Sequence, residues 1–525
     1  MANSPKHNFP PRKLIFSKKA SIVILLFFLN FFFFSFTYYL HHYPSLSFTF
    51  QSHDHHHHHL HLTLPHPNSF SKLPFSSKTW PILPSYLPWS PPSSTLYSCE
   101  GFFGNGFSKT YTLYPRLFSN SVKSTNSWFR CHYSGTLRSS ICEGGRVLMD
   151  PNKIRMSIGG ERIEEVIGRS DDDELPSFEK GSFRLRRKGV KKRRAFSKEF
   201  LDKIVHQGQI MKHTMKDLFQ SMEVVDDNQD DFNCSQWIEE PTLLLTRFEY
   251  ANVFHSYTDW YSAYVSSKVT GLPTRPNVVF VDGHSKTQLE DTWEALFSSI
   301  RFAKNFTDPV CFRHAVFVPL GYETAWFKGL SQHIDCRGAS ARALWANPDD
   351  RKTARLSEFG EMIKAAFDFP VDTPRKPKSS EYNVLFVRRE NYLAHPRHGG
   401  KVESRLSNEQ EVFDSLKSWA SNYSQCNINL VNGLFGHMPM REQIRAIEDA
   451  SVIIGAHGAG LTHVVSALPE SVILEIISSQ FQRPHFQLIS QWKGLEYHAI
   501  NLSGSSANPV KVIERLKKIL RSIGC

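Results

Sequence analysis

The stretch "SVIIGAHGAGLTHVVSALPESVILEII", residues 451–477, decides the fold class. It predicts a buried strand, a glycine-rich loop, a helix opening at about Gly460 and a second buried strand, which together form a βαβ unit. Both strands are short and apolar on both faces, as in a parallel sheet that helices cover on each side. The unit indicates an α/β domain whose ligands bind at the carboxyl ends of the strands.

The same alternation of apolar strands and helices extends to both sides of this unit. A polar, proline-containing linker at residues 372–381 divides it into two series. We predict further strands at 241–248, 277–282, 311–318, 383–387 and 428–431, and helices at 257–268, 288–300 and 440–449. This pattern predicts two Rossmann-like α/β domains that face each other across a cleft.

The N-terminus carries a membrane-anchor signal. Residues 20–40 are apolar, contain no charge and follow a basic segment. At about 1.5 Å per residue a helix of this length spans roughly 30 Å, enough to cross a bilayer. The basic flank predicts a cytoplasmic tail and a luminal body, with a cleaved signal peptide as the alternative.

A luminal position changes how the composition is interpreted. The net charge of +12 suits nucleic acid, an anionic membrane or a negatively charged small substrate, and a lumen excludes nucleic acid. The 8 cysteines become candidates for disulfides. No CxxC pair occurs, so the sequence does not indicate a zinc site. Four glycosylation sequons become usable, at Asn233, Asn305, Asn422 and Asn501.

Several biased segments precede the α/β pattern. The tract "HDHHHHHLHL", residues 53–62, suggests a metal site or, alternatively, part of a solvated stem. Residues 80–89 are aromatic and proline-rich and are expected to dock on the body as a strap. Residues 99–156 predict a β-rich, disulfide-tied cap, and the basic run at 184–194 predicts a solvated loop.

The glycine-rich loop has the chemistry of an anion site. Helix N-termini present free N–H groups, and glycines let an anion approach the backbone closely. The loop reads G-x-x-G-x-G rather than the dinucleotide G-x-G-x-x-G, and it lacks the lysine of a P-loop. We expect it to bind a phosphate or diphosphate; a plain tight turn between strand and helix is the alternative. His457 lies in this loop, and His463 further on is expected to pack.

Charged residues at neighbouring strand ends support the anion site. Arg388 and Arg389 follow the strand at 383–387 directly, and guanidinium groups pair well with phosphate oxygens. Surface arginines paired with nearby glutamates are the alternative. Glu475 is a lone carboxylate in an apolar strand, where it accepts ribose hydroxyls or pairs with a buried base.

The first α/β series has its own polar concentration at residues 247–264. On a helix His255 and Asp259 lie one turn apart, as a general base and the group that orients it would. A helix cap and a core histidine are the alternative. Tyr257 and Trp260 either stack on sugar rings or fill the core. "FVDGH", with Asp282 and His284, lacks the second carboxylate of an Asp-x-Asp metal site.

These motifs together resemble glycosyltransferase family 61. The family has an Asn-x-x-His…Asp block, a double arginine after a strand and a His-Gly-Ala-Gly-Leu loop. Here these are Asn252, His255 and Asp259, then Arg388 and Arg389, then residues 457–461. Longer stretches, such as "FVRRENYLAHPRHGGKVESRL" and the terminal "GC", are similar to its plant members, and the resemblance covers residues 80–525.

The resemblance implies a Golgi type II membrane enzyme of the GT-B fold. It would transfer xylose, with inversion, from UDP-xylose to O2 of the core β-linked mannose of N-glycans, without a metal or other cofactor. We assign catalysis to Asp259 or His255, and acceptor binding to Asn252, Tyr257 and Trp260. The donor-binding set is Arg388, Arg389, Gly455, His457, Gly458, Ala459, Gly460, Leu461 and Glu475.

The implied organisation has five parts. These are a cytoplasmic tail (1–19), a signal anchor (20–40), a stem (41–95), an acceptor-side domain with the Cys-rich cap (96–375) and a nucleotide-sugar domain (376–525). Two other functions stay open: a transferase of the same fold that uses N-acetylglucosamine or arabinose, and a non-enzymatic luminal glycan-binding protein built around the histidine tract.

Overall fold

The fold is known from a computed structural model, in which residues Lys72–Cys525 form one compact unit. The structure describes residues 78–81, 107–116, 126–135, 137–208, 210, 212–226, 232–331, 356–371, 381–389 and 405–525. The predicted tail, signal anchor and histidine tract lie outside these residues. Within the described ranges, no helix is both long enough and apolar enough to span a membrane.

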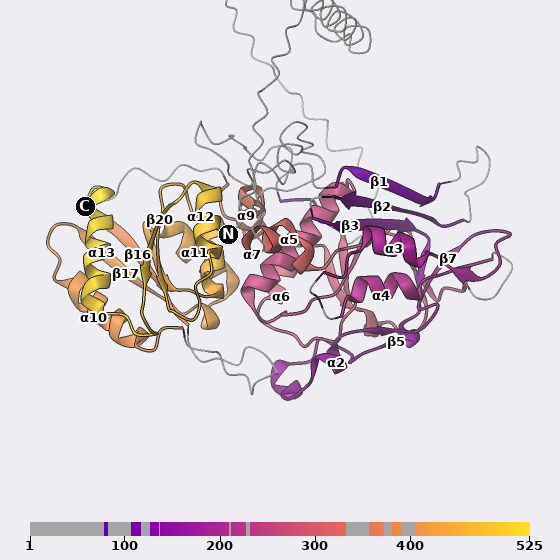
Figure 1. Cartoon of the computed structure of the whole chain (residues 1–525), viewed down its shortest axis with the longest axis horizontal. Coiled ribbons are helices and arrows are strands. Elements are labelled where there is room, and N and C mark those ends of the chain that lie inside the picture. Colours follow the sequence, from indigo (N-terminus) through magenta and orange to yellow (C-terminus); the bar gives the residue numbers. More distant parts are fainter. Residues whose placement is uncertain are drawn as a thin grey trace, which may run out of the picture. The chain divides into compact units, whose positions relative to one another are not determined.

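The C-terminal part contains a five-stranded parallel sheet (Figure 1). Its strands are β16 (Glu381–Val387), β17 (Asn427–Gly433), β18 (Val452–Ala456), β19 (Val472–Ile477) and β20 (Glu496–Asn501). Its helices are α10 (Glu409–Ser421), α11 (Met440–Asp449), α12 (His485–Lys493) and α13 (Pro509–Ser522). The spatial order β17-β16-β18-β19-β20 reverses direction between β16 and β18, which is where open α/β sheets bind ligands.

Alternate residues of these strands bury two different faces. Val384, Phe386 and Leu474 pack with the apolar side of α10 and α13. Leu385 and Ile473 belong to a second cluster that includes residues of α11 and α12 and extends into the N-terminal part. Both faces are buried because helices cover both, which explains why the strands are continuously apolar in sequence. The predicted α/β alternation is confirmed here.

The N-terminal part contains a seven-stranded mixed sheet. Its order is β1 (Lys109–Tyr114), β2 (Trp128–Ser134), β3 (Ser139–Gly145), β15 (Ala315–Phe317), β11 (Thr242–Leu245), β12 (Asn277–Phe280) and β13 (Ser299–Phe302). The last four strands are parallel, and the first three are antiparallel. The predicted Cys-rich cap is therefore not a separate layer, because β3 pairs with β15 and extends the main sheet.

A second, six-stranded sheet packs in the same part of the molecule. Its order is β10 (Gln236–Ile238), β14 (Val310–Phe312), β4 (Val147–Met149), β7 (Phe183–Arg186), β9 (Glu223–Val225) and β8 (Arg193–Arg194). A two-stranded sheet joins β5 (Ile154–Arg155) and β6 (Ser177–Phe178). The helices of this part are α2 (Asp171–Glu174), α3 (Lys198–Ile204), α4 (Thr214–Ser221), α5 (Val253–Val269), α6 (Glu290–Leu296), α7 (Ala325–Ser331) and α9 (Leu356–Ala366).

Three local predictions are wrong in detail. The single strand expected at 311–318 is two strands, β14 and β15, which belong to different sheets because the chain crosses from one to the other at Arg313 and His314. The helix expected at 288–300 ends at Leu296, since Phe297 is already extended and β13 follows.

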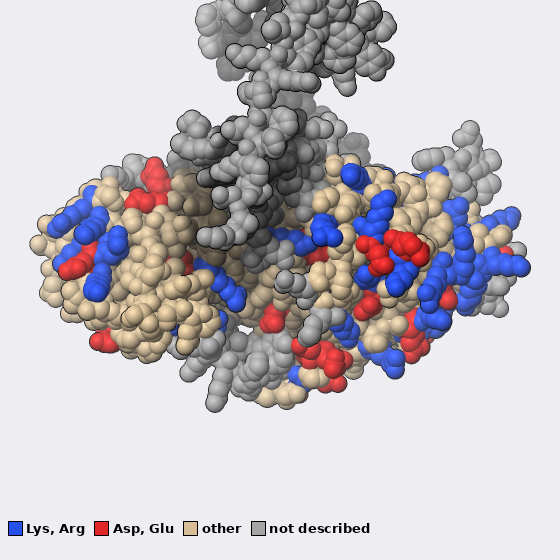
Figure 2. Space-filling model, in the orientation of Figure 1, with Lys and Arg blue, Asp and Glu red and all other residues tan. Residues whose placement is uncertain are grey.

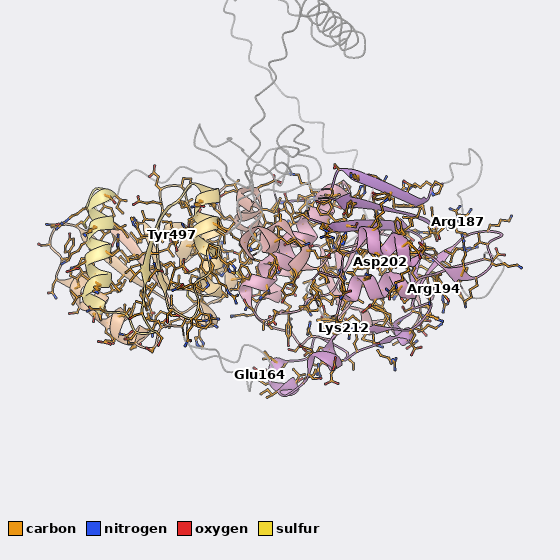
Figure 3. The ribbon with its side chains drawn as sticks, in the orientation of Figure 1. Glu164, Arg187, Arg194, Asp202, Lys212 and Tyr497 are labelled. Carbon is orange, nitrogen blue, oxygen red and sulfur yellow. A yellow bond between two sulfur atoms is a disulfide. The ribbon has the colours of Figure 1, made fainter. Side chains whose placement is uncertain are left out.

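The third concerns the basic run at 184–194. Its ends form β7 and β8, where Arg184 is buried and pairs with Asp150, while residues 188, 189, 191 and 192 between them are exposed as expected. Basic side chains gather around this segment (Figure 2), which Figure 3 marks with Arg187 and Arg194.

Disulfides join neighbouring and distant segments. Cys131 and Cys142 are paired residues of β2 and β3. Cys234 is joined to Cys311, and Cys426 to the terminal Cys525. The described cysteines thus behave as the luminal interpretation predicts. The start of the predicted strap docks as expected: Trp80 is buried and its indole N–H donates to the Leu272 carbonyl (3.2 Å).

Candidate functional site

The predicted anion-binding residues lie together where the strand order of the C-terminal sheet reverses, between β16 and β18. β16 ends at Val387 and is followed by Arg388 and Arg389, while β18 ends at Ala456 and is followed by His457. The two strands are neighbours, with Val387 opposite Gly455. The double arginine and the glycine-rich loop therefore meet at the same edge of the sheet.

The two arginines point to different partners. The guanidinium of Arg388 is held by Gln410 (2.6 Å) and lies near Glu409 (3.6 Å), both on α10. Arg389 instead lies against the loop: a Cβ placed on Gly458 would be 3.1 Å from its Nη1 atom. Of the pair, only Arg389 is brought to the loop by these contacts.

One part of the glycine-rich loop is closely packed and another part is partly exposed. Gly460 faces Val387, whose Cγ1 would lie 2.9 Å from an added Cβ, and Leu461 is fully buried. Gly458, Ala459 and Gly460 are partly exposed. The helix that follows is a 3-10 helix, η11 (Ala459–Ser466), and begins one residue earlier than expected. Its first N–H groups have no partner within the helix, so they can face an anion.

His457 is held rigidly from the neighbouring strands. Its Nδ1–H donates to Glu475 (2.5 Å), and its backbone N–H donates to the Ile476 carbonyl (2.8 Å). The other oxygen of Glu475 accepts from the hydroxyl of Tyr497 (2.5 Å). Of the two roles considered for Glu475, the structure shows pairing with a base.

The acceptor-side histidine lies on the first turn of α5. Asn252 caps this helix, its side chain accepting from the Phe254 N–H (3.0 Å). His255 is partly exposed, while its Nδ1 atom is buried without a hydrogen-bond partner. Burial, followed by the charge of Arg483, lowers the pKa of His255 to about 4, so the ring is neutral near pH 7.

Asp259 does not orient His255. The carboxyl group is enclosed against a 3-10 helix, η7 (Gly321–Glu323), and accepts from the Gly321 N–H. Burial raises its pKa well above the usual range, while the nearby Arg247 opposes that shift. The expected hydrogen bond between His255 and Asp259 is not formed.

His485, at the start of α12, connects the two halves of the site and was missed from sequence. Its ring stacks on Phe254 (centroids 5.1 Å apart) and lies 6.0 Å from the ring of His457. Burial and then the charge of His457 lower its pKa to about 4, and His255 contributes as well. The only sequence signal for His485 is its place just beyond the carboxyl end of β19. Three histidines, His255, His457 and His485, thus converge from both parts of the molecule.

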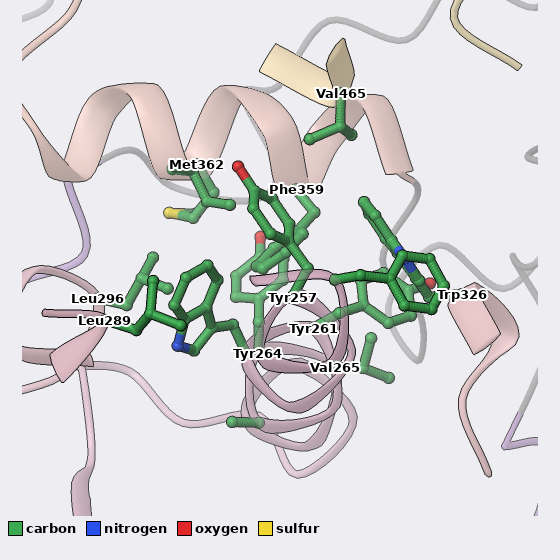
Figure 4. Packing of buried hydrophobic residues seen from close by; sticks show 14 of the residues in the cluster. Tyr257, Tyr261, Tyr264, Val265, Leu289, Leu296, Trp326, Phe359, Met362 and Val465 are labelled. Carbon is green, nitrogen blue, oxygen red and sulfur yellow. The ribbon is translucent and has the colours of Figure 1, made fainter. Parts of the chain in front are cut away.

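Tyr257 and Trp260 fill the core, the second of the two alternatives considered for them. Both are fully buried, and Figure 4 shows Tyr257 among Tyr261, Phe359 and Trp326. The hydroxyl of Tyr257 is hydrogen-bonded to Nδ1 of His463 (3.0 Å), which joins α5 to the helix after the glycine loop. Neither aromatic ring is accessible to a glycan, so the acceptor-binding role predicted for Tyr257 and Trp260 is wrong.

Comparison with known proteins extends over both halves of this site. The family profile described as Glycosyltransferase 61 matches residues 211–474, a range that holds α5, the double arginine and the glycine-rich loop. The chain belongs to glycosyltransferase family 61. The curated β-1,2-xylosyltransferase of Arabidopsis thaliana is 60% identical over 483 residues, which cover 85% of this chain and 90% of the relative.

Other curated relatives are similar to this chain to different extents. Beta-1,2-xylosyltransferase RCN11 of Oryza sativa subsp. japonica is 58% identical over 458 residues, or 86% of this chain and 84% of the relative. The EGF domain-specific O-linked N-acetylglucosamine transferase of Gallus gallus is 24% identical over 281 residues, or 51% of this chain and 45% of the relative. Similarity to the xylosyltransferases thus covers most of both chains.

The polar residues of "FVDGH", Asp282 and His284, form buried ion pairs and hydrogen bonds within the protein. Asp282 is buried in a pair with Arg247 (2.8 Å). His284 lies between Glu174 (2.8 Å) and the Arg247 carbonyl (2.9 Å). Across the described residues, no group of three or more His, Cys, Asp or Glu is arranged to hold a metal ion. The four predicted sequon asparagines are all exposed.

Proposed function

We propose that this chain is an inverting β-1,2-xylosyltransferase that moves xylose from UDP-xylose to O2 of the core β-linked mannose of N-glycans. The observation that carries the proposal is the 60% identity to a β-1,2-xylosyltransferase over 90% of that protein's length. The convergence of the acceptor-side and donor-side histidines supports it, because both substrates must meet at one place.

In the proposed donor site the diphosphate of UDP occupies the glycine-rich loop. The N–H groups at the start of η11 and the guanidinium of Arg389 face the phosphate oxygens, and Nε2 of His457 is the ring atom that reaches them. Fixed donors of this kind neutralise the charge that develops on a departing phosphate. The proposed reaction therefore uses protein groups where other transferases use a metal ion or cofactor.

Inversion requires one direct displacement and one base. In the proposed step the mannose O2 hydroxyl attacks C1 of xylose, the C1–O bond to UDP breaks, and the hydroxyl proton passes to His255. His255 is favoured over Asp259 because its ring is partly exposed and neutral near pH 7, whereas Asp259 is enclosed.

The proposed location is the Golgi membrane. Residues 20–40 would anchor the chain in type II orientation, with the body in the lumen and arranged as a GT-B fold whose two α/β parts flank the cleft. The described disulfides and the exposed sequons fit a luminal body.

The direct test is transfer by the full-length chain in detergent. Incubated with UDP-xylose and a biantennary N-glycan that carries terminal N-acetylglucosamine, it should add the mass of one pentose to the glycan. UDP-N-acetylglucosamine and UDP-arabinose serve as competing donors, because the Gallus gallus relative acts as an N-acetylglucosamine transferase. No pentose gain, or faster transfer from another donor, would overturn the assignment.

A further inference from the structure

A buried carboxylate lies on an inner strand of the donor-side sheet. Glu475 is fully buried on β19, with Gly455 opposite it on β18 and Ala499 opposite it on β20. These two small residues leave room for the carboxylate on a face that is otherwise apolar. A buried carboxylate without partners would cost several kcal/mol, so its partners decide what it does.

Each oxygen of Glu475 has one short hydrogen bond. Oε1 accepts from Nδ1 of His457 (2.5 Å) and Oε2 accepts from the hydroxyl of Tyr497 (2.5 Å). Tyr497 lies on β20, is half-buried and is labelled in Figure 3. The three residues come from the end of β18, from β19 and from β20, so the sheet itself sets their spacing.

The hydrogen bond to Glu475 determines which ring nitrogen of His457 can bind a ligand. Nδ1 is occupied by Glu475, so Nε2 is the ring nitrogen that can reach a ligand in the loop. The ring packs against Phe486 (5.1 Å) and lies 6.0 Å from His485, and Arg389 lies over the neighbouring Gly458.

We propose that Glu475 and Tyr497 are positioning residues for the donor, acting through His457. Tyr497 holds Glu475, and Glu475 holds the imidazole so that Nε2 faces the diphosphate. With UDP bound, the ring takes up a proton from solvent, so that Nδ1–H donates to Glu475 and Nε2–H donates to a phosphate oxygen. Glu475 then contributes to donor affinity without touching the ribose. The inference rests on the proposed donor site.

Tyr497→Phe tests the far end of the chain because it removes only the hydroxyl. Tyr114→Phe is the matched control: Tyr114 is also half-buried and loses one hydrogen bond, from its hydroxyl to the Ala195 carbonyl (2.7 Å), far from the loop. UDP affinity is measured by calorimetry on the full-length chain, with the thermal midpoint of each variant. Tyr497→Phe should weaken UDP binding about tenfold, and Tyr114→Phe should not.

A double-mutant cycle separates positioning from general loss of packing. In a His457→Gln background, Tyr497→Phe and Glu475→Gln should cause no further loss of UDP affinity, since the ring they orient is gone. An undiminished loss in that background would overturn the inference, as would a Tyr497→Phe variant that behaves like Tyr114→Phe. If the wild type binds UDP, those results leave the proposed function intact; no UDP binding by the wild type would overturn both.

Discussion

At the scale of the residue, His255 carries the proposed proton transfer. His255→Gln should lower turnover by about 10²-fold or more, because general-base catalysis is worth that much, and should leave UDP affinity unchanged. Asp259→Asn is the comparison, since burial raises the pKa of Asp259 well above its usual range and an amide is close in shape to the carboxyl group. Rates and UDP affinities of both variants are the measurement; activity lost in Asp259→Asn and kept in His255→Gln would make Asp259 the base.

The neighbouring arginines are expected to differ, although sequence assigned both to the donor. Arg389→Ala should weaken UDP binding about tenfold or more by calorimetry, because a charged donor beside the loop is lost. Arg388→Ala should instead lower the thermal midpoint, since its guanidinium ties β16 to α10 through Gln410. Equal losses of UDP affinity in the two variants would show that Arg388 also reaches the donor.

At the scale of the element, the strand–loop–helix unit depends on glycines for two separate reasons. Gly460→Ala places a Cβ 2.9 Å from Val387 and should cost about 1–3 kcal/mol in the free energy of unfolding. In Gly458→Ala the added Cβ lies 3.1 Å from the flexible end of Arg389 and at an ordinary contact distance (3.6 Å) from the Ala456 carbonyl, so this change should reduce UDP affinity more than stability.

Gly504→Ala is the matched control for the two loop variants, because nothing lies within 4 Å of its added Cβ. Urea denaturation and UDP calorimetry on the three variants would check both statements. A Gly458→Ala variant that binds UDP like the wild type would contradict the role given to that position.

At the scale of the whole molecule, buried histidines link the stability of the site to pH. Burial lowers the pKa of His463 to about 3, and those of His255 and His485 to about 4, from an ordinary 6.5. The unfolded chain therefore binds more protons than the folded chain between about pH 4 and 6.5. Their contribution to stability is complete above pH 6.5 and falls as the pH drops toward 4.

His463→Gln isolates one of these contributions. The raised pKa of Asp259 gives a slope of the opposite sign, so the difference between variant and wild type is the informative quantity. Between pH 5 and 6.5 the unfolding free energy of the wild type should rise more steeply than that of the variant, by up to about 1.4 kcal/mol per pH unit. Urea denaturation at several pH values measures it; parallel curves would contradict the burial of a neutral His463.

The sequence by itself determined the local order of the chain. Continuous apolar runs predict the strands of the parallel sheet, and α11 has the bounds expected from its periodicity. The meeting of Arg389 with the glycine loop also followed, because neighbouring parallel strands bring their ends to one edge.

Only the tertiary structure decided which polar residues act together. His255 and His485 meet through Phe254, and Glu475 meets Tyr497, although nothing in local spacing relates them. Sequence spacing did suggest a bond between His255 and Asp259, but the backbone at Gly321 takes the carboxyl group instead. Periodicity specifies the face of a helix or strand, whereas the partner on that face is set by how separate elements pack.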